Sequence, residues 1–388
     1  MDAGGVPAQV TPGARNVRRV VAIMGTRPEV IKLAPVVRAL RLRSGFAVRV
    51  CSTGQHGEMA RQALGAFGLE VDVQFDAMSA AESLGSLTAR LFHDVDLMLE
   101  SEAPDWVLVQ GDTTSAMVGA VCAFYRHIKV GHVEAGLRTF DRRAPFPEEI
   151  NRTFIAHVAD LHFAPTNRAA ENLARADVAA DRIHVTGNTV VDALAELASG
   201  VAGGTPEGLD PEIGRFIEGR RLVLVTSHRR EAFGQGLRNI CHALREIVAR
   251  YPDAVIVYPV HLNPNVRGAV HAQLEGHDRI RLLEPLDYGP LIWLMQRSYV
   301  VLTDSGGIQE EAPTFGKPVL VMREVTERPE GIEAGCARLV GTSVEGIVAG
   351  ACELFDNRAS YETMTAVANP YGDGHASERI AQLLSSRG

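Results

Sequence analysis

A chain of 388 residues exceeds the size at which a single hydrophobic core stops growing, so its length predicts two domains. Hydrophobic residues make up 46% of the chain and charged residues 22%, which is typical of a folded globular protein and excludes a disordered one. The net charge of −8 argues against binding to nucleic acid or to an anionic membrane surface, because both need a basic face.

The cysteines are too scattered to act together. Five occur, and no two form a CxxC pair; they are Cys51, Cys122, Cys241, Cys336 and Cys352. This usage supports neither a disulfide framework nor a thiolate zinc site, and it fits a cytoplasmic protein. No apolar run approaches the ~18 residues of a membrane helix. Residues 1–16 lack the apolar core of a signal peptide, and we expect a flexible tail there.

From residue 17, short β-rich runs alternate with helical patterns. Strands are predicted at residues 17–24, 46–53, 105–110 and 129–134, and helices at 28–43, 57–67, 82–102 and 113–126. Such alternation is typical of βαβ units, in which helices cover both faces of a parallel sheet. We therefore expect an N-terminal Rossmann-like domain over residues 17–199.

The alternation is interrupted by a glycine- and proline-rich stretch, SGVAGGTPEGLDPEIG, which begins at Ser199. Predicted strands resume at residues 221–227, 254–260, 280–285, 298–304 and 317–322. A second, C-terminal Rossmann-like domain is therefore expected over residues 200–374. A last helix, residues 375–388, follows the breaker NPYGDG, and we expect it to return to the first domain.

In open parallel sheets, ligands bind outside the carboxyl ends of the strands, so the residues just after each apolar run matter most. After the first strand, GTRPEVIK places Arg27 and Lys32 near the start of a helix. Cations there oppose the helix dipole, which favours a bound anion such as phosphate over a merely solvated helix end.

Two carboxylates follow the next pair of predicted strands, Asp112 in GDTTS and Glu134 in HVEAG. If these strands are neighbours, spaced ~4.8 Å apart, both side chains can reach one pocket, where repulsion and burial push their pKa values apart. One could then act as a base and the other as an acid. Asp112 could instead cap the helix that follows it.

The second half of the chain carries groups suited to a nucleoside diphosphate. His228, followed by two arginines, could donate a proton to a departing phosphate. Ser305, Gly306 and Gly307 open a helix, where their backbone amides form an anion nest, and an acidic residue about one turn further can accept both hydroxyls of a ribose. Arg328 lies on a loop that we expect at the same edge.

Two common nucleotide-binding motifs are missing from the sequence. Neither GxGxxG followed by an acidic residue nor GxxxxGK(S/T) occurs, and no set of His, Asp and Glu has a recognisable metal-ligand spacing. We expect neither a dinucleotide cofactor nor a bound metal. Arginine, lysine and helix ends would then have to neutralise the diphosphate.

A series of longer motifs identifies a family. In order they are GTRPEVIKLAPVV, TGQHGEM, VQGDTTSAMVGA, HVEAGLRT, PFPEEINR, VTGNTVVDAL, TSHRREAFG and LTDSGGIQEEAPTFGKPVLVMREVTERPE. Across about residues 18–385 the chain resembles the non-hydrolysing UDP-N-acetylglucosamine 2-epimerases. The resemblance implies the GT-B fold, two Rossmann-like domains with the active site in the cleft between them. It further implies a homodimer that interconverts UDP-GlcNAc and UDP-ManNAc without NAD or metal.

Where the motif letters match, the resemblance assigns roles to individual residues. The catalytic set is Asp112, Glu134, Glu148 and His228. The substrate-binding set is Arg27, Lys32, Ser305, Gly306, Gly307, Glu311 and Arg328. Within this second set the Ser-Gly-Gly turn would hold the diphosphate and the glutamate the ribose.

The resemblance also touches a second ligand site. Gln55 and His56 match positions near which bacterial members of the family bind a second UDP-GlcNAc as an activator. In this chain Gly57 replaces the usual arginine, and Glu58 and Glu82 stand where glutamine is frequent. Acidic groups repel a diphosphate sugar, so these differences disfavour activation.

The expected reaction needs a way to remove the C-2 hydrogen of the sugar, which is not acidic because no carbonyl is attached to that carbon. Loss of UDP creates an oxocarbenium-like centre that makes this hydrogen removable, so we expect elimination to 2-acetamidoglucal and re-addition of UDP. Three other functions stay open. The first is a GT-B glycosyltransferase. The second is a hydrolysing epimerase, against which the RPE of GTRPEVIK argues. The third is a non-catalytic nucleotide-sugar sensor, which the retained carboxylates disfavour.

Overall fold

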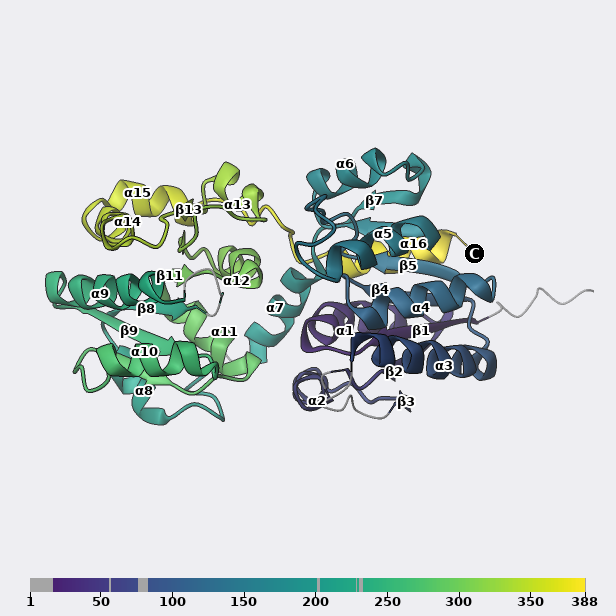
Figure 1. Cartoon of the computed structure of the whole chain (residues 1–388), viewed down its shortest axis with the longest axis horizontal. Helices are drawn as coiled ribbons and strands as arrows, with labels where there is room; N and C mark the ends of the chain where they lie inside the picture. The colour runs from purple at the N-terminus through teal and green to yellow at the C-terminus, as the bar shows by residue number, and fades with distance from the viewer. Residues whose placement is uncertain are drawn as a thin grey trace, which may run out of the picture.

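The computed structural model describes residues 17–55, 57–75, 83–200, 203–227, 229 and 233–387, and in these residues it contains two parallel sheets (Figure 1). The first sheet has the strand order β3-β2-β1-β4-β5-β6-β7. Its strands are β1 (Arg18–Met24), β2 (Phe46–Ser52), β3 (Val73–Gln74), β4 (Trp106–Gln110), β5 (Lys129–Val133), β6 (Leu161–Ala164) and β7 (Ile183–Val185). The predicted tail, residues 1–16, lies outside the described residues.

Helices lie on both faces of this sheet. They are α1 (Arg27–Arg41), α2 (Gly57–Ala66), α3 (Leu84–Glu102), α4 (Thr114–Tyr125), α5 (Glu148–Val158), α6 (Asn167–Arg175) and the short η1 (Ala180–Arg182). One hydrophobic cluster lies under α1 and α2, and another lies under α3, α4 and α5. Every residue of β4 is buried, as expected for a central strand of a parallel sheet that is covered on both sides.

The second sheet has the strand order β10-β9-β8-β11-β12-β13. Its strands are β8 (Arg221–Thr226), β9 (Ala254–Pro259), β10 (Ile280–Leu283), β11 (Ser298–Thr303), β12 (Val319–Val321) and β13 (Ala337–Leu339). The helices around it are α8 (Pro211–Ile217), α9 (Gln235–Arg250), α10 (Pro264–Leu274), α11 (Tyr288–Arg297), α12 (Gly306–Glu311), η3 (Ala312–Phe315), α13 (Pro329–Ala334), α14 (Val344–Asp356) and α15 (Arg358–Thr365).

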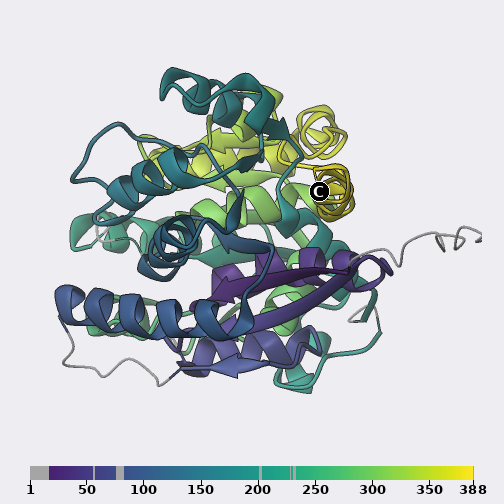
Figure 2. The same cartoon turned by 90° about the vertical axis from the view of Figure 1, so that its right-hand side faces the viewer.

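The chain crosses between the sheets twice. Helix α7 (Thr189–Gly200) leads from the first sheet toward the second and contacts α1 on one side and α11 and α12 on the other. Helix α16 (Ala376–Ser386) ends the chain beside α1, where Ile380, Ala381 and Leu384 join the core of the first sheet. Figure 2 views the molecule from the side of the first sheet and shows α16 in yellow at the end marked C.

The predicted α/β class with parallel sheets is confirmed, and the predicted strands and helices lie within a few residues of those observed. The sequence pattern does not predict β3, β6, β7 and β13, which have two to four residues each. Among the described residues, no helix combines the length and the apolar character that crossing a membrane requires.

Candidate active site

Charged residues from both sheets meet at the carboxyl ends of the strands. Lys32, on the first turns of α1, forms an ion pair with Glu134 at the end of β5, and its Nζ lies 3.8 Å from Glu310 Oε2 on α12. Arg328, just before α13, forms an ion pair with the same Glu310. All four side chains are at most 15% exposed. The cluster therefore combines two of the predicted cations with one predicted carboxylate and joins the two halves of the molecule.

Glu134 has a backbone conformation that non-glycine residues seldom adopt, with φ at 61°. Its carboxylate accepts hydrogen bonds from Gln110 and from Asn188 Nδ2, the latter at 3.3 Å. Burial acts to raise the pKa of Glu134, but the Lys32 ammonium, Arg328 and the Asn188 amide outweigh it, so the pKa is lowered. A strained, buried and ionised carboxylate of this kind is typical of a catalytic site.

Asp112 follows β4, the strand next to β5, and its carboxylate has a separate partner. Arg152 on α5 donates from Nε to Asp112 Oδ2 at 2.8 Å, and its terminal nitrogen lies 2.6 Å from the same oxygen. The alternative that Asp112 caps the next helix is wrong, because the hydroxyl of Thr113 accepts the cap hydrogen bond from the Ala116 N–H. Asp112 is thus held by an arginine and is 24% exposed, which leaves it reachable from outside.

His132, on β5, is a buried histidine that contacts the loop carrying Asp112. Its Nε2 is 2.7 Å from the Gly111 carbonyl oxygen, and both Asp112 and Glu134 act on its pKa. Burial nevertheless lowers the pKa of His132 to about 4, so the ring is neutral near pH 7. A neutral imidazole can donate to the Gly111 carbonyl and so hold the loop that carries Asp112.

Glu148 and Glu149 are adjacent and differ sharply in their surroundings. Glu148 is the first residue of α5, and its Oε2 is buried without a hydrogen-bonding partner among the described residues. Glu149 accepts hydrogen bonds from Arg138 at 2.7 Å and from the Thr139 N–H at 3.0 Å. Burial acts to raise the pKa of Glu149, but these donors outweigh it and lower the pKa. Glu149 therefore anchors the loop before α5, whereas Glu148 keeps an acceptor available for a ligand.

The predicted diphosphate site lies at the start of α12. Ser305 is the N-cap residue, and Gly306 and Gly307 are the first two residues of the helix. A Cβ atom added at Gly306 would lie 3.7 Å from the guanidinium carbon of Arg328 and 3.8 Å from a terminal nitrogen of Arg229. Two guanidinium groups thus stand beside the first residues of a helix, whose backbone N–H groups have no carbonyl partner within the helix, an arrangement that suits phosphate oxygens.

The predicted ribose acceptor, Glu311, lies at the end of α12 and is 9% exposed. Burial and, to a smaller extent, the neighbouring Glu310 raise the pKa of Glu311 to about 7. Arg27 lies near this carboxyl group, with its guanidinium 5.5 Å from the centre of the Tyr288 ring. The Tyr288 hydroxyl interacts with Glu311, yet neither this hydroxyl nor Glu311 Oε2 completes a hydrogen bond within the described part of the chain. Both buried oxygens can therefore still bond to ligand hydroxyls at this end of α12.

Two predicted residues, His228 and His56, lie outside the described residues. Gln55 is described, and its amide oxygen accepts a hydrogen bond from the Ser115 hydroxyl at 2.7 Å. Ser115 in turn hydrogen-bonds to Thr53 at 2.7 Å. Gln55 thus packs into the loops at the strand ends, and its part in binding an activator stays a prediction.

Several residues of the site are not predicted by the sequence reasoning. Glu29 is fully buried, and its carboxylate accepts hydrogen bonds from the Thr26 N–H at 2.7 Å and from the Thr113 hydroxyl at 2.6 Å. It ties the loop after β1 to the loop that carries Asp112. The spacing of Thr26 and Glu29 is that of a capping box, a signal that could have revealed this contact. No comparable local signal marks Asn188, Glu310 or Arg152.

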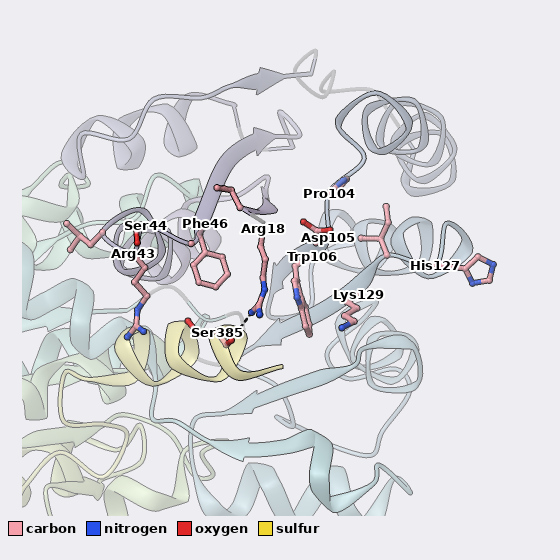
Figure 3. A pocket seen from close by; sticks show the side chains of 14 residues that line it. Arg18, Arg43, Ser44, Phe46, Pro104, Asp105, Trp106, His127, Lys129 and Ser385 are labelled. Carbon is pink, nitrogen blue, oxygen red and sulfur yellow. Dashed lines mark hydrogen bonds between the residues drawn. The ribbon is translucent and has the colours of Figure 1, made fainter. Parts of the chain in front are cut away.

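A hollow of about 1170 Å³ lies at the opposite edge of the first sheet, away from these residues (Figure 3). Two of the cations that line it, Arg18 and Lys129, already have partners. Arg18 donates to the carbonyls of Leu384 and Ser385, and Lys129 donates to that of Arg387 at 3.2 Å. These cations complement the C-terminal end of α16, so the hollow is explained by helix packing. None of the predicted site residues lines it.

Comparison with known proteins identifies the family. A family model described as UDP-N-acetylglucosamine 2-epimerase matches residues 38–385. The UDP-N-acetylglucosamine 2-epimerase of Salmonella typhimurium is 48% identical over 372 residues, which cover 95% of this chain and 98% of that protein. UDP-GlcNAc 2-epimerase from Neisseria meningitidis, crystallised with UDP-GlcNAc bound, is 39% identical with a TM-score of 0.85, covering 95% of this chain and all of that one.

A more distant structure bears on the fold alone. The glycotransferase of kitacinnamycin is 14% identical with a TM-score of 0.63, and the match covers 96% of this chain and 99% of that one. Together with the epimerase structure it confirms the expected GT-B fold. The sequence identity separates the two neighbours, and the family model and the Salmonella relative show that the chain belongs to the UDP-N-acetylglucosamine 2-epimerase family.

Proposed function

We propose that this protein interconverts UDP-GlcNAc and UDP-ManNAc by inverting C-2 of the sugar. The observation that carries the proposal is the buried cluster at which Lys32 and Glu134 of the first sheet meet Glu310 and Arg328 of the second. It combines cations for a diphosphate with an ionised carboxylate for a proton, and it does so in a chain of the 2-epimerase family.

The reaction divides into an elimination and an addition. In the first half, the bond between C-1 and the phosphate oxygen breaks and its electron pair leaves with UDP. A carboxylate takes the C-2 proton, and the electrons of the C–H bond form the C-1 to C-2 double bond of 2-acetamidoglucal. In the second half, a proton is delivered to the other face of C-2, and UDP attacks C-1. Both halves need donors that stabilise UDP and acid–base groups on both faces of the sugar.

The residues of the site match these needs. Glu134 and Asp112 would exchange the C-2 proton on opposite faces, with Glu134 held by Lys32 and Asp112 by Arg152. Glu148, whose Oε2 has no hydrogen-bonding partner in the part of the chain that the structure describes, would stabilise the developing sugar cation. His228 is the fourth catalytic residue that the family motif assigns.

UDP would be held at the second sheet. The Ser305, Gly306 and Gly307 turn, flanked by Arg328, would bind the diphosphate, and Glu311 would accept the ribose hydroxyls. Arg328, together with Arg27 and Lys32 of α1, would neutralise the negative charge on the departing UDP. The same arrangement would suit the donor of a glycosyltransferase, and the difference lies in the carboxylates that face the sugar.

We further propose a homodimer in the cytoplasm. Leu97, Phe124, Tyr125 and Phe154 are 51 to 69% exposed. They lie on the neighbouring helices α3, α4 and α5, where a partner subunit could cover them. The five separate, unpaired cysteines favour a reducing compartment.

Incubating the full chain with UDP-GlcNAc alone tests the activity, with the nucleotide products resolved by anion-exchange chromatography and NMR. The proposal expects UDP-ManNAc to appear without a second substrate, until the two sugars reach a constant ratio. Free ManNAc with UDP would instead identify a hydrolysing epimerase, and turnover only with an added acceptor would identify a glycosyltransferase. A Glu148→Gln variant should lose this activity, whereas Glu246→Gln, on the exposed face of α9, should retain it.

A further inference from the structure

Asn188 lies at the point where the chain leaves the first sheet. It precedes α7, is 2% exposed, and belongs to the motif VTGNTVVDAL, to which the chemistry above gives no role. Its backbone N–H donates to the Tyr371 carbonyl at 2.7 Å, in the segment that returns from the second sheet. The two crossings of the chain are thus joined here by a backbone hydrogen bond that does not involve the Asn188 side chain.

The orientation of the Asn188 side chain follows from its hydrogen bonds. Its Oδ1 accepts a hydrogen bond from the Val190 N–H at 3.1 Å, which turns Nδ2 the other way. Nδ2 then lies 3.3 Å from Glu134 Oε1 and 3.0 Å from Glu310 Oε2. An amide nitrogen carries two hydrogens, so one side chain can donate to both carboxylates at once.

The groups around Glu134 explain why an uncharged hydrogen-bond donor suits position 188. Lys32 and Arg328 are the charged groups that lower the pKa of the Glu134 carboxylate. Glu310 shares Lys32 with it, and the neutral His132 precedes it on β5. Gln110 adds an uncharged donor. Two carboxylates close together repel each other, and a neutral donor between them offsets this repulsion without cancelling either charge.

We propose that Asn188 is a positioning residue for epimerisation, whose amide holds the Glu134 carboxylate toward the substrate and links it to Glu310 of the second sheet. This inference rests on the proposed function, because it assigns Glu134 to proton transfer at C-2. An aspartate at position 188 would replace the donor by an acceptor of the same shape. An alanine would remove the donor and leave the backbone bond to Tyr371 in place.

The test is the pH dependence of kcat for epimerisation at saturating UDP-GlcNAc, measured for the natural protein, Asn188→Asp and Asn188→Ala. Saturation keeps the protonation of Glu311 in the free protein out of the profile. Because the Asn188 amide favours ionised Glu134, its loss should move the acidic limb of the profile to higher pH, by about one unit or more in Asn188→Asp. The loss of activity should therefore shrink as the pH rises. Asn172→Ala serves as a matched control, since this buried asparagine donates to the Gly136 carbonyl and not to a carboxylate. The acidic limb of its pH profile should not move.

The outcomes separate the two proposals. If the natural protein does not epimerise UDP-GlcNAc, the proposed function fails. If it does, and both Asn188 variants lose activity equally at every pH with an unmoved limb, Asn188 has only a structural role and the inference is overturned. Asn188→Asp keeps the size and the Val190 bond, so an unmoved limb in this variant overturns the inference even when Asn188→Ala does not fold.

Discussion

Lys32 Nζ lies 3.8 Å from Glu310 Oε2, although the two residues belong to elements of different sheets. The same ammonium group is paired with Glu134, so one cation serves a carboxylate from each half of the molecule. Burial acts to lower the pKa of Lys32, but the two glutamates outweigh it and raise the pKa. Lys32 is therefore charged at neutral pH and holds the halves together through charge.

Removing this cation should damage both stability and activity. In Lys32→Met, Glu134 and Glu310 would face each other without their lysine, and breaking a buried ion pair costs about 3–5 kcal/mol. We expect urea unfolding to show a loss of this size, with epimerisation reduced at least about 100-fold. Lys32→Arg keeps the charge and should recover most of the stability. Equal stability of Lys32→Met and the natural protein would contradict the role of the ion pair.

The ion pair between Arg152 and Asp112 predicts a separate effect on turnover. In Arg152→Gln, Asp112 would lose its cation, and we expect kcat to fall about 100-fold with a much smaller change in KM. Arg142→Gln is the matched control, because Arg142 is exposed on the loop before α5. Steady-state kinetics would distinguish the two. A change confined to KM would mean that Arg152 binds the substrate and does not orient Asp112.

Glu29 predicts a pH dependence of folding. Burial raises its pKa to about 7 from 4.5, so the folded state binds more protons than the unfolded state between these values. The contribution of Glu29 to the free energy of unfolding, about 3 kcal/mol, is therefore fully present below pH 4.5. It is lost as the pH rises toward 7. Glu29→Gln, which keeps the shape, should remove this loss.

Urea unfolding at pH 4.5 and 7.5 would check the Glu29 prediction. The free energy of unfolding of Glu29→Gln minus that of the natural protein should increase with pH. Glu246→Gln, which alters an exposed pair with Arg250, should show no such trend. A difference for Glu29→Gln that does not change with pH would rule out the proposed titration.

Glu311 predicts a pH dependence of substrate binding. The ribose hydroxyls would donate to the ionised carboxylate, while burial raises the pKa of Glu311 to about 7 in the free protein. KM should therefore rise as the pH falls below 7, because binding must then compete with protonation. Glu311→Gln should raise KM at pH 8 about ten-fold or more, with little dependence on pH. An unchanged KM in this variant would exclude Glu311 from the ribose site.

The exposed apolar residues on α3, α4 and α5 predict a subunit interface. Replacing Phe124 and Phe154, which are 52% and 53% exposed, by glutamate should convert a dimer to a monomer without unfolding it. Light scattering coupled to size-exclusion chromatography would report the mass. Phe140→Glu, on the exposed loop before α5, is the control and should leave the dimer intact. A monomeric natural protein would contradict the interface.

The sequence predicts the strand ends well because parallel sheets place the residue after each strand at a common edge. Lys32, Glu134 and Arg328 were expected near a ligand on this ground, and the structure brings them into one buried cluster. Asp112 was expected beside Glu134, but its carboxylate pairs with Arg152. The position of a side chain after a strand is thus predictable from the sequence. The partner of that side chain depends on how helices from other parts of the chain pack against the strand ends.

Contacts between distant segments explain most of what the sequence does not reveal. Glu310 is separated from Asn188 by 122 positions, and no local pattern connects them. Glu311 was preferred over Glu310 as the ligand residue from the family motif, and the structure gives the two glutamates different partners. Glu310 pairs with Arg328, whereas Glu311 keeps a buried oxygen without a partner in the described structure. Only the packed interface of the two sheets distinguishes these adjacent residues.

The central claim is that C-2 of the sugar is deprotonated and reprotonated while UDP is detached. Incubation of the natural protein with UDP-GlcNAc in deuterated water, followed by NMR and mass spectrometry, tests this most directly. We predict one deuterium at C-2 in UDP-ManNAc, and in recovered UDP-GlcNAc as well, with the sugar still joined to UDP. UDP-ManNAc that contains no deuterium at C-2, formed at a normal rate, would contradict proton exchange with solvent at the carboxylates Glu134 and Asp112.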